Sequence, residues 1–83
     1  MVRITGVEHR GSYELRISFS NGTAGDVDIA GELIRGVFEP LRDLSLFTRV
    51  EVDPELGTLV WPNGADLDPE SLLDVVRPVE PAN

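Results

Sequence analysis

The sequence predicts a small α+β domain, and three features carry this prediction. Segments 13–29 and 49–61 each combine alternating polar and apolar residues with the turn residues of a β-hairpin. A third segment, at 68–78, begins with Asp-Pro and ends with a proline, as a short helix does. We therefore expect a small antiparallel β-sheet built from hairpins, with short helical turns in the middle of the chain and a C-terminal helix packed on the sheet.

The first strand is expected at the start of the chain, where Val2 and Ile4 alternate with polar neighbours. Gly6 breaks the alternation before Val7, which predicts a bulge or bend in this strand. The sequence HRGS at 9–12 is typical of a turn and is expected to lead into the next strand.

The second strand is the clearest, because polar residues separate its apolar ones: Tyr13, Leu15, Ile17 and Phe19. The register of its hairpin follows from the cost of burying charge. A two-residue turn would set Ile17 opposite Asp26 and bury the carboxylate against the apolar face, which is costly. We predict a three-residue loop at 20–22, with its glycine in the left-handed conformation, which pairs Leu15 with Val27.

Residues 30–48 are rich in apolar side chains but keep no sustained period. We expect short helical turns here, lying across the sheet. Pro40 suits the first turn of one of them, and Asp43 can cap another that runs through Phe47.

A second hairpin is predicted from short strands at 49–53 and 58–61. The connection at 54–57 contains a proline, which fixes one turn position, and a glycine, which permits a positive φ. A four-residue loop places Val52 opposite Leu59.

The C-terminal helix is predicted to start at Asp68 and Pro69, with the Asp68 carboxylate accepting a backbone N–H of the first turn. Three apolar residues of this helix are expected on one buried face: Leu72, Val75 and Val76. Pro78 is expected to end the helix, and Arg77 has the charge that a helix C-terminus favours.

Composition limits what the domain can be. The chain has 83 residues, of which 41% are hydrophobic and 27% charged, as in ordinary globular proteins. We assign residues 1–77 to a single α+β domain and 78–83 to a flexible tail. The sequence contains no cysteine, which excludes disulfides, thiolate metal sites and cysteine nucleophiles.

Charge and hydropathy indicate which partners to expect. Fifteen acidic residues against seven arginines give a formal net charge of −8, which opposes direct binding to nucleic acid or to an anionic membrane. The first twenty residues lack the apolar stretch of a signal peptide, and no segment has the roughly 20 apolar residues of a membrane helix. We therefore expect a cytoplasmic protein.

The side chains that could perform catalysis or bind metal are not grouped as those functions require. His9 is the only histidine and lies in the predicted turn, and no serine lies in a nucleophile-elbow sequence. Alternating acidic sets occur at 26–28, 51–55 and 66–70, but none has the ligand spacing of a calcium loop. We expect no enzyme activity, no tightly bound metal and no cofactor.

Trp61 is the most informative aromatic residue, and two interpretations of it stay open. It can fill the core with its indole N–H near the rim, or it can anchor an interface beside the rigid Pro62-Asn63-Gly64 turn. The interface candidates are Trp61, Asn63, Asp66, Val50 and Leu59.

Four segments together resemble the DUF2442 family of uncharacterised small bacterial proteins: SFSNGTAGDVDI, FEPLRD, LFTRVEVD and GTLVWPNGADLDPESL. They occur in the order of the family, over roughly residues 2–76. The resemblance implies a small α+β domain, which in some relatives is joined to a downstream helix-turn-helix domain and in others is encoded beside a small partner protein, as in toxin–antitoxin pairs. It brings no established catalytic residues. Because this chain ends at Asn83, we do not expect DNA binding to carry over to it.

The leading functional hypothesis is a non-catalytic module that interacts with a protein partner or with its own copy, in its specific form an antitoxin-like partner of a small bacterial protein. Three observations favour this hypothesis: the sequence lacks catalytic groupings, its core is small, and its net charge is strongly acidic. Two alternatives stay open, an accessory part of a regulator that reaches DNA through another chain and a small-molecule-binding domain.

Overall fold

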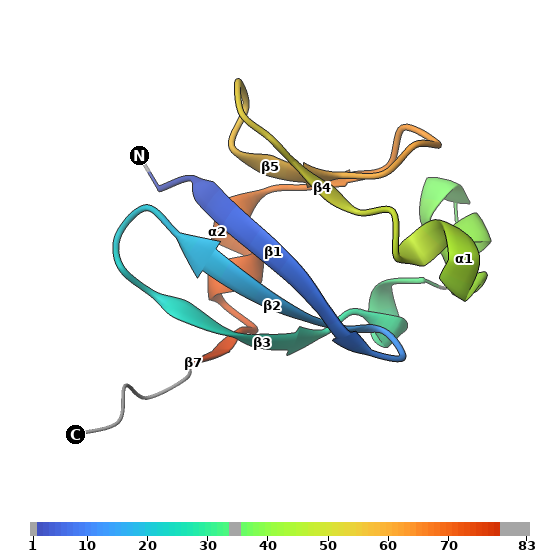
Figure 1. Cartoon of the computed structure of the whole chain (residues 1–83), viewed down its shortest axis with the longest axis horizontal. Helices are drawn as coiled ribbons and strands as arrows, with labels where there is room; N and C mark the ends of the chain where they lie inside the picture. Colours follow the sequence, from blue (N-terminus) through green and yellow to red (C-terminus); the bar gives the residue numbers. More distant parts are fainter. Residues whose placement is uncertain (1, 34–35, 79–83) are drawn as a thin grey trace.

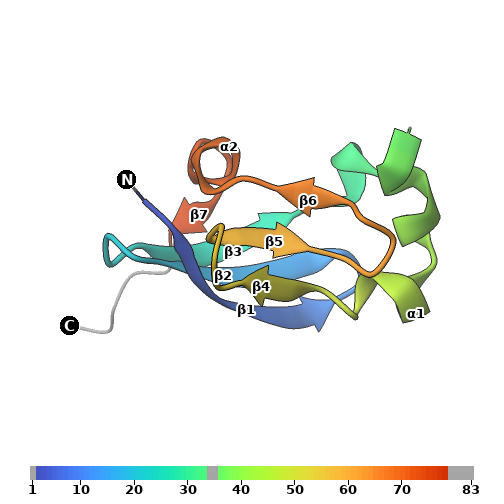
Figure 2. The same cartoon turned by 90° about the horizontal axis from the view of Figure 1, so that it is seen from above.

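The computed structural model describes residues 2–33 and 36–78, and within these the side chains of Glu32 and Pro78 are not described. The strands form two antiparallel sheets, one with the order β1-β2-β3-β7 and one with the order β4-β5-β6. The second sheet lies over the first (Figure 1), and the helix α2 lies at the side of the molecule where β3 and β6 are found (Figure 2). The α+β class is confirmed, with the hairpins divided between two sheets.

The first sheet is built from β1 (Ile4–Gly11), β2 (Glu14–Phe19) and β3 (Ala24–Asp28). The predicted register of the β2–β3 hairpin is confirmed, since Leu15 pairs with Val27 and Asp26 lies opposite Arg16 instead of Ile17. The loop closes with the Phe19 N–H donating to the Thr23 carbonyl, and its glycine has a φ of +91°.

Strand β1 contains the predicted bulge, because its register against β2 shifts between Ile4 and Gly6. The turn predicted at 9–12 was wrong. Strand β1 continues to Gly11 through a second register shift, and the turn lies at Ser12 and Tyr13. Pairing with β2 gives the backbone of this segment hydrogen-bond partners, and this tertiary gain overrides the local preference of its residues for a turn.

Three short helical elements follow in the described part of the chain: η1 (Ala30–Glu32), η2 (Gly36–Arg42) and α1 (Leu44–Phe47). The cap on α1 is confirmed, because the Asp43 carboxylate accepts the Ser45 N–H at 3.0 Å. Two expectations were wrong. Pro40 lies inside η2 and not in its first turn, and η2 and α1 lie at one end of the sheets, on the right of Figure 1, and not across a sheet.

The second sheet contains β4 (Glu51–Asp53), β5 (Thr58–Val60) and the unpredicted two-residue β6 (Asp66–Leu67). Val52 pairs with Leu59, as predicted. The Arg3 side chain holds the β4–β5 turn to the first strand, with its Nη2 donating to the carbonyls of Pro54 at 2.7 Å and Glu55 at 2.8 Å.

Helix α2 (Pro69–Leu73) starts at the predicted place, but the Asp68 side chain makes no capping hydrogen bond and the helix ends five residues before Pro78. The chain turns after Leu73 and forms β7 (Arg77–Pro78), which pairs with β3 at Gly25 and Asp26. The expected position of Arg77 at a helix end was therefore wrong, because pairing with β3 satisfies its backbone. Of the predicted tail, Pro78 belongs to β7, and residues 79–83 lie outside the described part of the chain.

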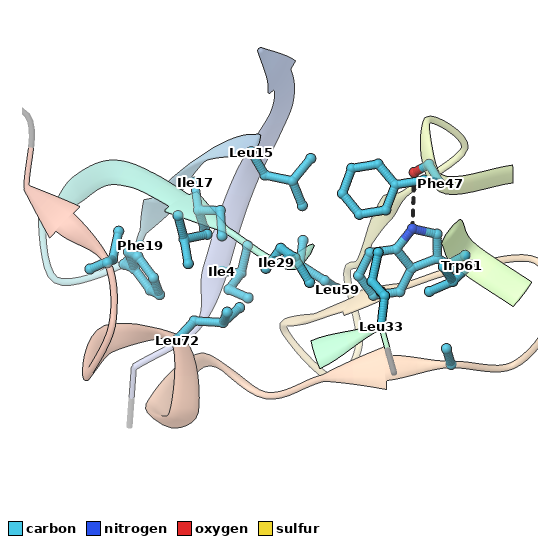
Figure 3. Packing of buried hydrophobic residues seen from close by; sticks show 14 residues of the cluster. Ile4, Leu15, Ile17, Phe19, Ile29, Leu33, Phe47, Leu59, Trp61 and Leu72 are labelled. Atoms are coloured by element: carbon cyan, nitrogen blue, oxygen red, sulfur yellow. Dashed lines mark hydrogen bonds between the residues drawn. The ribbon is translucent and has the colours of Figure 1, made fainter. Parts of the chain in front are cut away.

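The core lies between the two sheets and contains side chains from both of them, from the helical segment and from α2. Figure 3 shows Leu72 of α2 pointing toward Ile4 and Phe19, while Phe47 and Trp61 fill the opposite end. The predicted buried face of the last helix is only partly correct, because Leu72 and Val76 are buried but Val75 is 56% exposed. The early end of α2 is the reason, since Val75 no longer follows helical periodicity.

Candidate functional site

The five predicted interface residues differ in how far the structure buries them. Trp61 and Leu59 are buried in the core, so neither side chain is available to a partner in this fold. Val50 is half-buried against the same core, while Asn63 and Asp66 are exposed. Proposing Trp61 and Leu59 as interface anchors was therefore wrong, because burial between the sheets already removes their apolar surface from water.

Trp61 fills the end of the core that adjoins the helical segment. Its indole Nε1 donates to the Phe47 carbonyl at 3.0 Å (Figure 3), and its ring lies 6.0 Å from that of Phe47 and 6.4 Å from that of Phe38, measured between centroids. A buried indole N–H needs such a partner. The first of the two interpretations of Trp61, a core residue, describes its position.

Asn63 connects the 62–64 turn to η2. Its Nδ2 donates to the Val37 carbonyl at 2.8 Å, and its Oδ1 accepts the Ala65 N–H at 3.1 Å. In a 3₁₀-helix the N–H three residues after Val37 would bond to that carbonyl, but this residue is Pro40, which has no N–H. The Asn63 side chain therefore supplies the missing donor, which is a structural role.

A groove lies between β3 and β6, beside α2, and this is the candidate site. Its volume is about 260 Å³. Strand β3 and the residue after it form one wall, and β6 and the α2 segment form the rest; the lining residues are Val27, Asp28, Ile29, Leu67, Ser71, Leu72 and Val75. These lining residues place the groove at the side of the molecule where Figure 2 shows α2 next to β6 and β7.

Among the described residues, β6 has no neighbouring strand on its outer side, and β3 has one along only part of its length. Strand β6 is the edge of the second sheet. Strand β7 pairs with β3 only at Gly25 and Asp26, so β3 continues through Val27 and Asp28 beyond this partner. Such edges present backbone groups that another strand can pair with.

The groove side of the molecule is strongly acidic. Residues 50–76, which form the second sheet and α2, contain seven acidic residues and no basic one. Of these, Asp66 and Asp68 flank Leu67, and Glu70 and Asp74 lie at the start and end of α2; all four are exposed. A concentration of one charge sign attracts partners of the opposite sign.

The outer face of the first sheet differs, because its charges pair with one another. Glu8, Arg16, Asp26 and Arg77 form a row across the four strands, each opposite the next. The Arg16 guanidinium binds both carboxylate oxygens of Asp26, at 2.8 and 3.2 Å. This bidentate bond lowers the pKa of Asp26 and raises the pKa of Arg16.

No catalytic arrangement is visible among the residues that the structure describes. His9 lies in β1 and not in a turn; its Nε2 is 2.7 Å from the Ser12 carbonyl oxygen, and its ring meets Phe47 edge to face. Within 2–33 and 36–78, no three His, Asp or Glu side chains come together as metal ligands would. None of the described helices combines the length and the apolar character that crossing a membrane requires.

The sequence pattern does not reveal the groove, because its accessible apolar residues carry little local signal of exposure. Helical spacing predicts Val75 on the buried face of a longer helix, and the Asp-Leu-Asp segment around Leu67 draws attention only to its carboxylates. Alternation around Leu67 was the one available sign of an edge strand.

Comparison with known proteins gives one family. The family described as "Protein of unknown function (DUF2442)" matches residues 4–78. No curated protein and no solved structure matches the chain.

Proposed function

The chain belongs to the DUF2442 family, whose function is unknown, and we propose that it is a non-catalytic interaction module that binds a basic protein partner. The observation that carries this proposal is the distribution of charge. The four exposed carboxylates of β6 and the α2 segment form no ion pair within the described part of the chain, whereas Glu8, Glu14 and Asp26 of the first sheet each pair with an arginine.

Charge balance also favours a protein over nucleic acid as the partner. A net charge of −8 repels a phosphate backbone, and the arginines at 10, 16 and 77 are already engaged with carboxylates. In the specific form of the proposal, the chain is cytoplasmic and acts as the antitoxin-like partner of a small bacterial protein. The acidic side would then cover a basic surface of that protein.

The test is a pull-down from native lysate with identification of the retained proteins, repeated as salt is raised from low to above about 0.15 M, where charges are screened beyond roughly 8 Å. We expect one basic protein to be retained and its binding to weaken with salt. The double variant Asp66→Asn/Glu70→Gln should retain less of it. Glu8→Gln/Glu39→Gln, which changes the net charge equally but away from the groove, should retain nearly as much.

Three outcomes would contradict the proposal. A mass of one chain in light scattering at high concentration, together with no reproducible partner, would leave no interaction. A stable dimer would assign the binding surface to a second copy. Retention of DNA only when another chain is added would favour the accessory part of a regulator.

A further inference from the structure

The edges of β3 and β6 direct backbone groups away from their own sheets. In an antiparallel ladder, successive residues of a strand turn their N–H and C=O groups to opposite sides. The Ile29 N–H donates to the Tyr13 carbonyl, and the Trp61 N–H donates to the Ala65 carbonyl. By this parity the backbone groups of Asp28 and Asp66 point away from β2 and β5, toward the free edges.

The groove between these edges combines apolar surface with an acidic rim. Val75 is 56% exposed and Leu67 is half-buried, and the buried Val27 lines the same groove. Asp28 lines the groove, and Asp66 and Asp68 flank Leu67. An extended peptide can match both features with one apolar and one basic face, because its side chains alternate in direction.

We propose that this groove binds an extended basic segment of the partner protein, which adds as a strand to the free edge of β6. Backbone hydrogen bonds to Asp66 hold the segment in register. Its apolar side chains enter the groove over Leu67 and Val75, and its arginine or lysine side chains contact the acidic rim. This is recognition by strand addition, in which backbone bonds give affinity and the pocket gives specificity. The inference rests on the proposed function.

Size and charge favour this occupant over the others. A volume of about 260 Å³ lies below the roughly 300–1,000 Å³ of pockets that enclose a drug-sized molecule, so it suits one or two apolar side chains. A second copy of the chain would bring the same acidic edge against this one, and like charges oppose that contact.

The experiment is an NMR titration of the ¹⁵N-labelled full chain with a synthetic peptide of alternating arginine and valine. We expect the amide signals of Asp66, Leu67 and Val75 to shift most. The same peptide with proline at its centre, which lacks the pairing N–H, should bind at least tenfold more weakly. An alternating glutamate and valine peptide should leave these signals unchanged.

Two arginine variants separate this groove from general charge attraction. Val75→Arg and Leu56→Arg each add one positive charge at an exposed apolar residue, since Val75 is 56% exposed and Leu56 is 63% exposed. Leu56 serves as the control because it lies in the β4–β5 turn and does not line the groove. We expect Val75→Arg to weaken peptide binding at least tenfold and Leu56→Arg less than twofold. Equal weakening by both variants, shifts confined to the first sheet, or unmoved spectra at millimolar peptide would overturn the proposed groove.

The same two variants, used in the pull-down, distinguish failure of the groove from failure of the proposed function. A partner that Val75→Arg retains as well as Leu56→Arg does would keep the interaction module and overturn the groove. Loss with Val75→Arg alone supports both.

Discussion

The end of the molecule formed by η2 and α1, here called the helical end, differs from the groove side in how its polar groups are bonded. At the helical end, side chains of Tyr13, Trp61 and Asn63 donate to the carbonyls of Arg42, Phe47 and Val37, so the irregular backbone there is tied to the sheets. On the groove side, β6 and the end of β3 have no outer neighbouring strand among the described residues, and Val75 is exposed. The first region bonds its polar groups within the chain, whereas the second keeps backbone groups that no described strand pairs with.

The largest expected effect is at the helical end. Trp61→Ala removes a ring that is 4% exposed and its bond to Phe47. We expect a loss of about 3–5 kcal/mol in the free energy of unfolding, as for other large-to-small changes in cores. The measurement is urea denaturation followed by far-UV circular dichroism. Tryptophan fluorescence cannot be used, because Trp61 is the only tryptophan and the variant lacks it. Trp61→Phe keeps an aromatic ring and should lose less; a loss below about 1 kcal/mol for alanine would contradict this assignment.

A smaller effect tests why the helical end needs Asn63. Asn63→Ala leaves the Val37 carbonyl without its donor and should cost about 1 kcal/mol. In a Pro40→Ala background, the restored N–H can bond that carbonyl, so the same substitution should cost less. A double-mutant cycle in thermal unfolding measures the difference. Equal costs in both backgrounds would show that Pro40 is not the reason for the contact.

The outer face of the first sheet tests whether paired charges stabilise the chain itself. The bond to Arg16 lowers the pKa of Asp26 in the folded state, so its contribution is fully present above the unfolded pKa, about 4, and is lost as the pH falls through the folded value. Asp26→Asn should therefore lower Tm slightly at neutral pH and have less effect near pH 2. Arg16→Gln should show the same pH dependence. A Tm difference that grows on acidification would reverse the expected sign.

The smallest effect is expected on the groove side. Val75→Ser should change the free energy of unfolding by no more than about 0.5 kcal/mol, because Val75 is already exposed. Its neighbour Val76 is 9% exposed, and Val76→Ser should cost clearly more in the same denaturation experiment. Equal costs for the two variants would mean that Val75 stabilises the fold and is not free for a partner.

The sequence by itself determined the elements that depend on neighbouring residues. The register of the β2–β3 hairpin followed from keeping Asp26 off the apolar face, and the Asp43 cap and the pairing of Val52 with Leu59 followed from local turn chemistry. The α+β class follows from these elements. Each rests on contacts within about 15 residues of chain, which a pattern can reveal.

Only the tertiary structure decided the rest. Pairing of Arg77 with Asp26 joins residues 51 positions apart and ends α2 early, which exposes Val75, while packing between two sheets buries Trp61. The candidate groove exists because β3 extends beyond its pairing with β7 and because β6 has no outer neighbour in the described part of the chain. Such pairings gain free energy from backbone bonds and burial across distant segments, and local residue preferences carry no record of them.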